Sequence, residues 1–207
     1  MKSLKNVLIF SYYWPPAGGV GVQRWLKLTK YLPEFGWNPI IVTVKNGSYP
    51  YIDLSLLHEV PGNIEVHKTK TFEPFEWYNL LLGKRGKHVP TAVLDSSTNK
   101  NFLQKLAAFI RANFFIPDAR KGWVNFAIDT GEKIFRTKHI DAIVTTGPPH
   151  STHLIGLYFK KKYPIKWLAD FRDPWTHLFT NTYLPQINLV KKLDKKLEKR
   201  VLQAVDT

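Results

Sequence analysis

Residues 6–32 read NVLIFSYYWPPAGGVGVQRWLKLTKYL and predict a strand, a loop and a helix in that order. Residues 7–10 are uniformly apolar, as in a strand buried on both faces of a parallel sheet. Two prolines and three glycines within residues 14–21 prevent the strand from continuing. After the loop, residues suited to a buried helix face recur at a helical period: Val22, Trp25, Leu26, Thr29 and Leu32.

The glycine-rich turn that opens this helix is a candidate anion site. Such a turn presents unpaired backbone N–H groups and the positive end of the helix dipole. The turn is therefore suited to a phosphate or another anion, and the alternative is a tight connection that binds nothing. The turn is not a dinucleotide fingerprint, because Arg24 stands where G-x-G-x-x-G requires glycine. No Gly-Lys-Ser/Thr of a P-loop occurs either.

Length and composition limit the class of protein and the cofactors that it can hold. The chain has 207 residues, 44% of them hydrophobic, which is enough for one large domain with a real core. It has no cysteine, which excludes disulfides and cysteine zinc sites, and no convincing metal spacing is present, so we expect no metal and no cofactor. No apolar run approaches the roughly 20 residues of a membrane span. A cytoplasmic protein is expected, peripheral to the inner face of the membrane if it touches one.

The net charge of +14 predicts anionic partners: nucleic acid, anionic lipid or phosphorylated substrates. No RNP, KH or zinc-finger pattern occurs, so nucleic acid is not expected. Basic residues near aromatic segments favour an anionic membrane surface, and the alternative is a solvated basic face. The basic residues are Lys84, Arg85, Lys87, Lys105 and Arg111, and the aromatic residues are Trp77, Phe109, Phe114 and Phe115.

Hydrophobic patterning predicts a single α/β domain over residues 1–207. Strands are expected at residues 7–10, 39–44, 64–67, 141–145 and 165–169. Helices are expected at 22–32, 77–82, 101–113, 122–138, 148–162 and 187–205, with a helical turn at 53–58 and a basic loop at 83–88. Strands that alternate with helices predict right-handed crossovers and a Rossmann-like, doubly wound parallel sheet.

Two further loops carry chemistry. Residues 145–153 read TTGPPHSTH and residues 170–175 read DFRDPW, each at the end of a predicted strand. Ligands of doubly wound folds lie outside the carboxyl ends of the strands, so these loops and the glycine turn are expected to share one crevice. Their polar residues suit acid–base work or phosphate binding: Thr146, His150, His153, Asp170, Arg172 and Asp173.

Each of these residues also has a structural interpretation. His150 or His153 could cap a helix or fill a gap in the core. Asp173, which precedes Pro174, suits the N-cap of a helix, with Arg172 as its ion-pair partner. Asp170 is the stronger functional candidate, because it directly follows an apolar strand.

At these residues the chain resembles the N-terminal half of retaining glycosyltransferases of the GT-B type, family 4. The resemblance rests on residues 13–21, 146–150 and 170–175 and spans essentially the whole chain. It implies an acceptor-binding N-terminal domain, with a C-terminal domain absent from this chain that binds most of the nucleotide-sugar donor. Many relatives carry a histidine at the strand end that here reads Thr-Thr-Gly, so His150 or Asp170 would take its place.

The resemblance implies transfer of a sugar, with retention, from a nucleotide-sugar to a glycan or lipid-linked acceptor in cell-surface polysaccharide synthesis. His150 and Asp170 are the expected catalytic residues. The expected substrate-binding residues are Gly18, Gly19, Arg24, Thr146, His153, Arg172 and Asp173. The alternative function is a basic Rossmann-like module that binds nucleic acid or an anionic membrane without catalysis.

Overall fold

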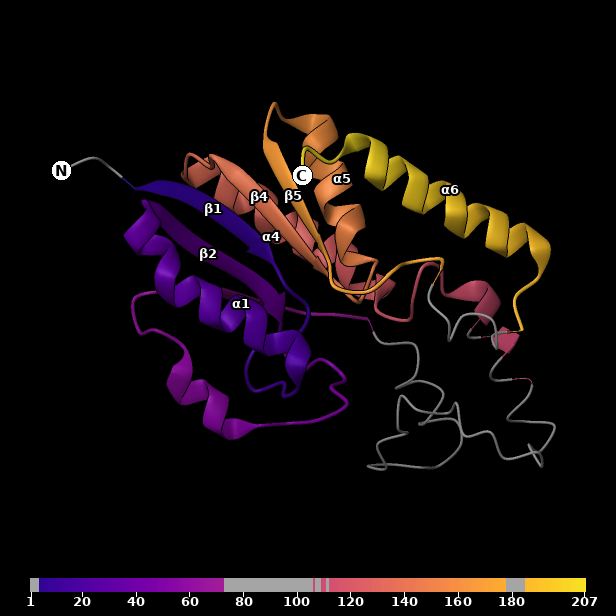
Figure 1. Cartoon of the computed structure of the whole chain (residues 1–207), viewed down its shortest axis with the longest axis horizontal. Helices are drawn as coiled ribbons and strands as arrows, with labels where there is room; N and C mark the ends of the chain where they lie inside the picture. Colours follow the sequence, from indigo (N-terminus) through magenta and orange to yellow (C-terminus); the bar gives the residue numbers. More distant parts are fainter. Residues whose placement is uncertain (1–3, 73–105, 107–108, 111, 178–184) are drawn as a thin grey trace.

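The computed structural model describes residues 4–72, 106, 109–110, 112–177 and 185–207. In this part of the chain, five parallel strands form one sheet in the order β3-β2-β1-β4-β5 (Figure 1). The strands are β1 (Lys5–Phe10), β2 (Trp37–Val44), β3 (Glu65–Thr69), β4 (Ala142–Gly147) and β5 (Lys166–Phe171). The predicted α/β class and the Rossmann-like, doubly wound parallel sheet are therefore confirmed.

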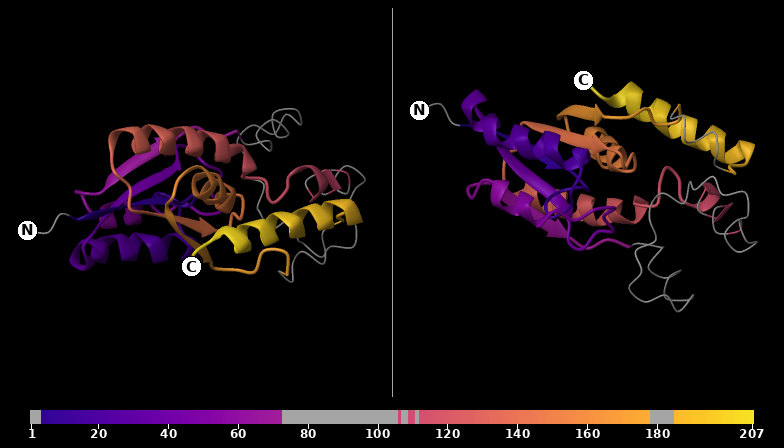
Figure 2. Two further views of the ribbon diagram at one scale, coloured as in Figure 1. Left: turned by 90° about the horizontal axis from the view of Figure 1, so that it is seen from above. Right: turned by 60° about the horizontal axis from the view of Figure 1, so that its bottom comes forward.

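Helices cover both faces of the sheet. They are α1 (Val20–Tyr31), α4 (Val124–Thr137), α5 (Thr152–Lys162) and α6 (Asn188–Ala204), with 3-10 turns η1 (Leu32–Phe35), η2 (Leu54–Glu59) and η3 (Lys121–Trp123). The chain moves from β1 to β2 in one direction and from β3 to β4 to β5 in the other. Right-handed crossovers therefore place α1 on one face and α4 with α5 on the opposite face (Figure 2).

The core lies where these layers meet. Leu8, Ile9 and Phe10 of β1 have no exposed surface, as expected for the central strand. Gly156 of α5 packs directly on Trp167 of β5, because a Cβ at Gly156 would lie 2.2 Å from the indole. The absence of a side chain there brings α5 close to the sheet.

The strand register brings the expected site residues to one edge. Phe10 at the end of β1 pairs with Val42 of β2 and with Thr145 of β4. Thr146 pairs with Asp170. Asp170 thus lies within β5 rather than after it, because β5 runs two residues beyond its predicted end.

Most predicted elements are confirmed to within a few residues. The prediction of which residues of α6 are buried is wrong in part. The helical period of the sequence predicts one apolar stripe that contains Leu189, Leu193 and Leu202, but these three leucines are 64%, 46% and 54% exposed. Asp194 takes their place in the interface beside Val190 and Val201. The predicted helix 77–82 and loop 83–88 lie outside the described residues, as does most of the helix 101–113. No helix in the described ranges is both long and apolar enough to span a membrane.

Candidate functional site

The expected site residues reach the same edge of the sheet but lie on opposite faces of β4 and β5. Successive strand residues point to opposite faces. Asp170 and Arg172 contact α1, whereas Phe171 stacks against α5. We therefore distinguish two groups. The Asp170 cluster contains Arg24, Trp25, Thr146, Asp170 and Arg172, and the His150 cluster contains Thr145, His150, His153, Phe171 and Trp175.

Asp170 connects α1 to the sheet through both carboxylate oxygens. Arg24 donates to Oδ1 at 2.5 Å, while Trp25 Nε1 and Thr146 Oγ1 donate to Oδ2 at 2.7 and 2.9 Å. The side chain of Asp170 is only 12% exposed. Three donors leave this carboxylate little capacity to accept a proton from a substrate. The geometry instead holds the half-exposed guanidinium of Arg24 in place at the edge of the sheet.

Arg172 brings a positive charge to the first turn of α1. Its Nε and NH2 donate to the backbone oxygens of Gly147 and Pro148 at 3.2 and 2.6 Å. Its NH1 lies beside Gly21, where a Cβ would come within 2.4 Å. Burial lowers the pKa of Arg172, and the nearby charges of Asp170 and Asp173 oppose that shift.

The residues of the glycine turn have two different environments: Gly18 is packed, whereas the N–H groups of the next residues are not hydrogen-bonded to any described residue. The N–H of Gly18 donates to Tyr51 O at 2.9 Å, and a Cβ at Gly18 would lie 2.2 Å from the Tyr51 ring. Gly18 therefore serves packing in this structure. Gly19 is exposed and adopts φ 92, a conformation that favours glycine. No hydrogen bond to any described residue occupies the N–H groups of Gly19, Val20 or Gly21.

His153 is a fully buried ring held by a chain of hydrogen bonds. Trp167 Nε1 can only donate, and it donates to Thr145 Oγ1 at 2.9 Å. Thr145 Oγ1 also shares a hydrogen bond with His153 Nδ1 at 2.9 Å, so the hydroxyl connects the indole to the imidazole ring. The ring stacks on Phe171 with centroids 4.2 Å apart. Burial lowers the pKa of His153 to about 3, so the ring is neutral at physiological pH.

His150 lies next to His153 and differs from it in its hydrogen bonding. Its ring stacks on Trp175 with centroids 5.3 Å apart and an angle of 5°. His150 is 8% exposed, and neither ring nitrogen has a hydrogen-bond partner among the described residues. The same is true of His153 Nε2 and the Thr152 hydroxyl. Buried polar atoms normally bond to protein or ordered water, so this group is a candidate position for a water or a ligand hydroxyl.

The charge state of His150 follows from its surroundings. Burial lowers its pKa, and Arg172 acts in the same direction. The carboxylates of Asp118, Asp173 and Glu198 oppose this shift, but they do not reverse it. Because its pKa is lowered, the His150 ring is neutral at physiological pH. A neutral imidazole can accept a hydrogen bond from a hydroxyl group.

Gly147 joins the two clusters. Its carbonyl oxygen accepts from Arg172 on one side. On the other side, a Cβ at Gly147 would lie 2.6 Å from His153 Nε2 and 3.2 Å from His150 Nδ1. The sequence Thr-Thr-Gly at the end of β4 therefore leaves room for both rings.

One expectation about the loop after β5 is wrong. Asp173 is exposed, and no helix begins after it within residues 174–177, so the N-cap interpretation is wrong for this part of the chain. The N-cap residue of α5 is Ser151, and Asp118 holds it in place by accepting from its backbone N–H and its hydroxyl, both at 2.8 Å. Sequence reasoning also missed Asp194, which accepts from Trp175 Nε1 at 2.9 Å. Its place among the apolar residues of α6 was the available signal.

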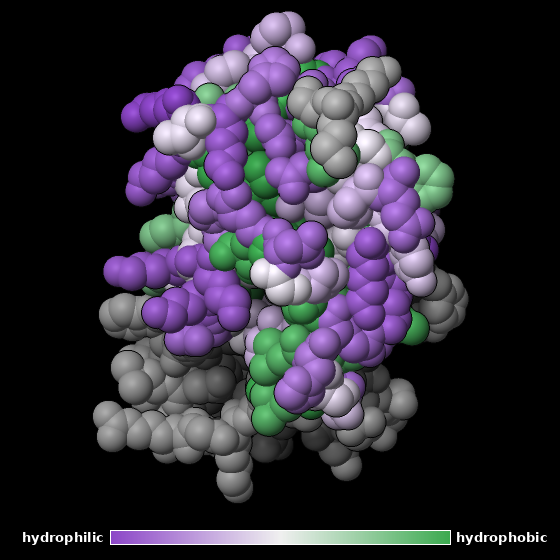
Figure 3. Space-filling model, turned by 90° about the vertical axis from the view of Figure 1, so that its left-hand side faces the viewer, coloured by the Kyte–Doolittle hydropathy of each residue, from purple (hydrophilic) through white to green (hydrophobic). Residues whose placement is uncertain are grey.

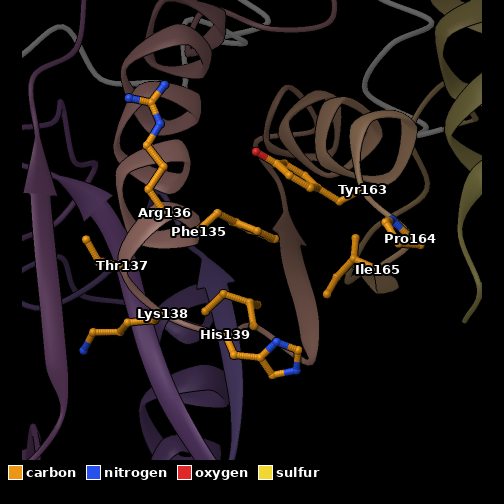
Figure 4. Close-up of a pocket in the computed structure, with 9 residues that line it drawn as sticks. Phe135, Arg136, Thr137, Lys138, His139, Tyr163, Pro164 and Ile165 are labelled. Carbon is orange, nitrogen blue, oxygen red and sulfur yellow. The ribbon is translucent and has the colours of Figure 1, made fainter.

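No group of histidines and acids suited to a metal ion occurs within the ranges that the structure describes. A hollow of about 530 Å³ lies at the opposite, amino edge of the sheet, between the ends of α4 and α5 (Figure 4). Arg136 and Lys138 point away from Tyr163 and Pro164 there, and Lys138 pairs with Glu65. Figure 3 looks onto this side, which is mostly hydrophilic. None of the expected site residues lines this hollow.

No family model and no curated protein sequence matches the chain. Among solved structures, the chain is similar to the C-terminal domain of a hydrogenase from Pyrococcus furiosus, with 13% identity and a TM-score of 0.41 over 83% of this chain and 94% of the other. It is also similar to the apo form of UGT2 from Phytolacca americana, with 10% identity and a TM-score of 0.39 over 80% of this chain and 28% of the other. Similarities this weak do not indicate what the chain does.

Proposed function

We propose that this chain is the acceptor-binding domain of a retaining glycosyltransferase whose donor-binding domain lies outside it. The supporting observation is the convergence of the three sequence motifs at the carboxyl edge of β1, β4 and β5. Open α/β sheets bind their ligands at this edge. There, exposed N–H groups and two guanidinium groups lie on one face of β4 and β5. On the other face lie histidine nitrogens that have no hydrogen-bond partner in the described part of the chain.

In this proposal the Asp170 cluster binds an anion. The N–H groups of Gly19 to Gly21 and the guanidinium groups of Arg24 and Arg172 would contact a phosphate of the acceptor or the diphosphate of the donor. Asp170 acts as a positioning residue, because its three donors hold Arg24 and the start of α1 against the sheet. This role differs from the catalytic one that the sequence suggests.

The His150 cluster would orient the acceptor hydroxyl. A neutral His150 accepts a hydrogen bond from that hydroxyl and raises its nucleophilicity. During transfer the hydroxyl oxygen bonds to the sugar carbon, the bond from that carbon to the donor phosphate breaks, and the leaving phosphate takes the proton. The His150 nitrogens are covered in this structure, so a substrate reaches them only after a side chain moves.

A nuclear magnetic resonance titration tests this function on the chain itself. Glucose 1-phosphate, a short-chain prenyl phosphate and UDP-glucose are added separately to isotope-labelled protein. We expect the sugar phosphate or the prenyl phosphate to shift the amide signals of Gly19 to Gly21 and the ring signals of His150. The variant Arg172→Gln should abolish these shifts. Arg136→Gln, which removes an exposed arginine at the opposite edge of the sheet, should preserve them.

Two results would overturn the proposal. One is the absence of any shift at these positions with all three probes. The other is salt-dependent binding of generic duplex DNA at the same positions, which favours the module without catalysis.

A further inference from the structure

α6 presents a strongly basic outer surface. Its only two acidic residues are turned inward. Asp194 is 5% exposed and accepts from Trp175, and Glu198 accepts from the backbone N–H and the hydroxyl of Thr176. All the basic residues of the helix are exposed: Lys191, Lys192, Lys195, Lys196, Lys199 and Arg200. The outer surface of α6 therefore carries six positive charges that no acid of the same helix offsets.

Exposed apolar side chains lie beside these charges at the start of the helix. Leu189 is 64% exposed and Ile187 47%. Phe114, which is 72% exposed, belongs to the neighbouring segment. Asn113 fixes that segment to the start of α6, because it donates to Pro185 O and accepts from Ile187 N, both at 2.8 Å. Large apolar residues and cations thus share one end of the helix.

Within the described part of the chain, the position of α6 leaves its outer surface exposed and accessible to a partner. The helix packs on α5 and extends along the outside of the domain (Figure 1). The stripe of Val190, Asp194 and Val201 faces inward, so the charged side is turned away from the sheet. The side of α6 that faces away from the domain thus combines lysines with exposed leucines, and both kinds of residue favour binding to an anionic membrane interface.

We propose that α6, together with Phe114, docks this domain on an anionic lipid bilayer. The six cations complement the negative headgroups, and Phe114, Ile187, Leu189 and Leu193 enter the boundary between headgroups and acyl chains. Duplex nucleic acid would match the charges but would gain nothing from the exposed leucines. This surface differs from the basic loop 83–88 that the sequence suggested, which lies outside the described residues. It also goes beyond the proposed transferase function, since docking requires no sugar transfer.

Vesicle flotation of the 207-residue chain tests the proposal. Vesicles of phosphatidylcholine are compared with vesicles that also contain phosphatidylglycerol. We expect binding to the anionic vesicles that weakens as salt is raised. Each cation near an anionic surface contributes about a fivefold factor in partitioning, so replacing Lys192, Lys195, Lys196 and Lys199 with Gln should lower it on the order of several hundredfold.

The matched control replaces four exposed lysines elsewhere on the domain, Lys68, Lys70, Lys121 and Lys133, with Gln. It has the same net charge as the α6 variant and should retain clearly more binding. A second variant, Leu189→Ser with Leu193→Ser, keeps every charge and should lower partitioning at least severalfold.

Three outcomes would overturn the proposal. The first is equal recovery of the protein with neutral and anionic vesicles. The second is equal binding by the α6 variant and the control. The third is release of the protein from anionic vesicles by a short duplex DNA at equal charge concentration, which would identify nucleic acid as the occupant.

Discussion

The free energy of unfolding of the variant Asp194→Asn, relative to that of wild type, should increase as the pH rises. Asp194 is 5% exposed, and burial raises the pKa of its carboxyl group from 3.8 to about 6. The charges of Asp118 and Glu198 act in the same direction, while the hydrogen bond from Trp175 opposes them. The folded protein therefore holds this proton more tightly than the unfolded chain does.

The sign and size of the effect follow from this difference. Because the folded pKa is the higher one, the stability that protonated Asp194 contributes is fully present below pH 3.8 and is lost as the pH rises through about 6. At about 1.4 kcal/mol per pH unit, the ionised carboxylate lowers the free energy of unfolding by about 3 kcal/mol above pH 7. At pH 4 the loss is under about 1 kcal/mol. Asn keeps an acceptor for Trp175 and cannot ionise.

Urea denaturation at pH 4 and pH 8 measures the effect on wild type and on Asp194→Asn. The amide hydrogens of Asn add an unfavourable contribution of about 1–3 kcal/mol, but it is the same at both pH values. The mutational change in the free energy of unfolding should thus be about 2 kcal/mol more favourable at pH 8 than at pH 4. Asp129→Asn on the exposed side of α4 is the matched control and should show no such difference. Equal changes at both pH values in the Asp194 variant would refute the reasoning.

Three further predictions concern the two clusters and the interface behind them. Asp170→Ala should lower the free energy of unfolding by about 2 kcal/mol, because Trp25 and Thr146 lose their acceptor, whereas Arg24→Ala should cost clearly less; equal losses in urea denaturation would contradict this account. Gly156→Ala should destabilise the fold by about 1 kcal/mol or more, since overpacking against the buried Trp167 exceeds the gain in helix propensity, and a more stable variant would count against it. The His153 ring should stay neutral from pH 8 down to pH 5, which its carbon and nitrogen resonances report directly, and a titration midpoint above pH 5 would disprove the assigned environment.

Local pattern alone was enough to predict the sheet. The apolar run of β1, the proline and glycine punctuation of the turn and the helical period of α1 are encoded over short distances, so they can be recognised in the chain without tertiary information. Alternating strands and helices then predict a doubly wound parallel sheet, because right-handed crossovers allow few other arrangements. The prediction that the glycine turn and the two later loops meet at one edge follows from the same rule.

Only the tertiary structure decided which side chains each polar residue contacts at that edge. A one-residue step along β5 turns Asp170 toward α1 and Phe171 toward α5, so one expected crevice becomes two clusters on opposite faces. The same holds for α6, where Asp194 is buried because Trp175 donates to it, while Leu189 and Leu193 remain exposed. Periodicity records which residues share a face of an element, whereas the side chains that meet that face come from segments distant in the sequence. Hydrogen-bond partners and burial depend on those distant segments, which is why the contacts of Asp170, His150 and Asp194 emerged only from the folded chain.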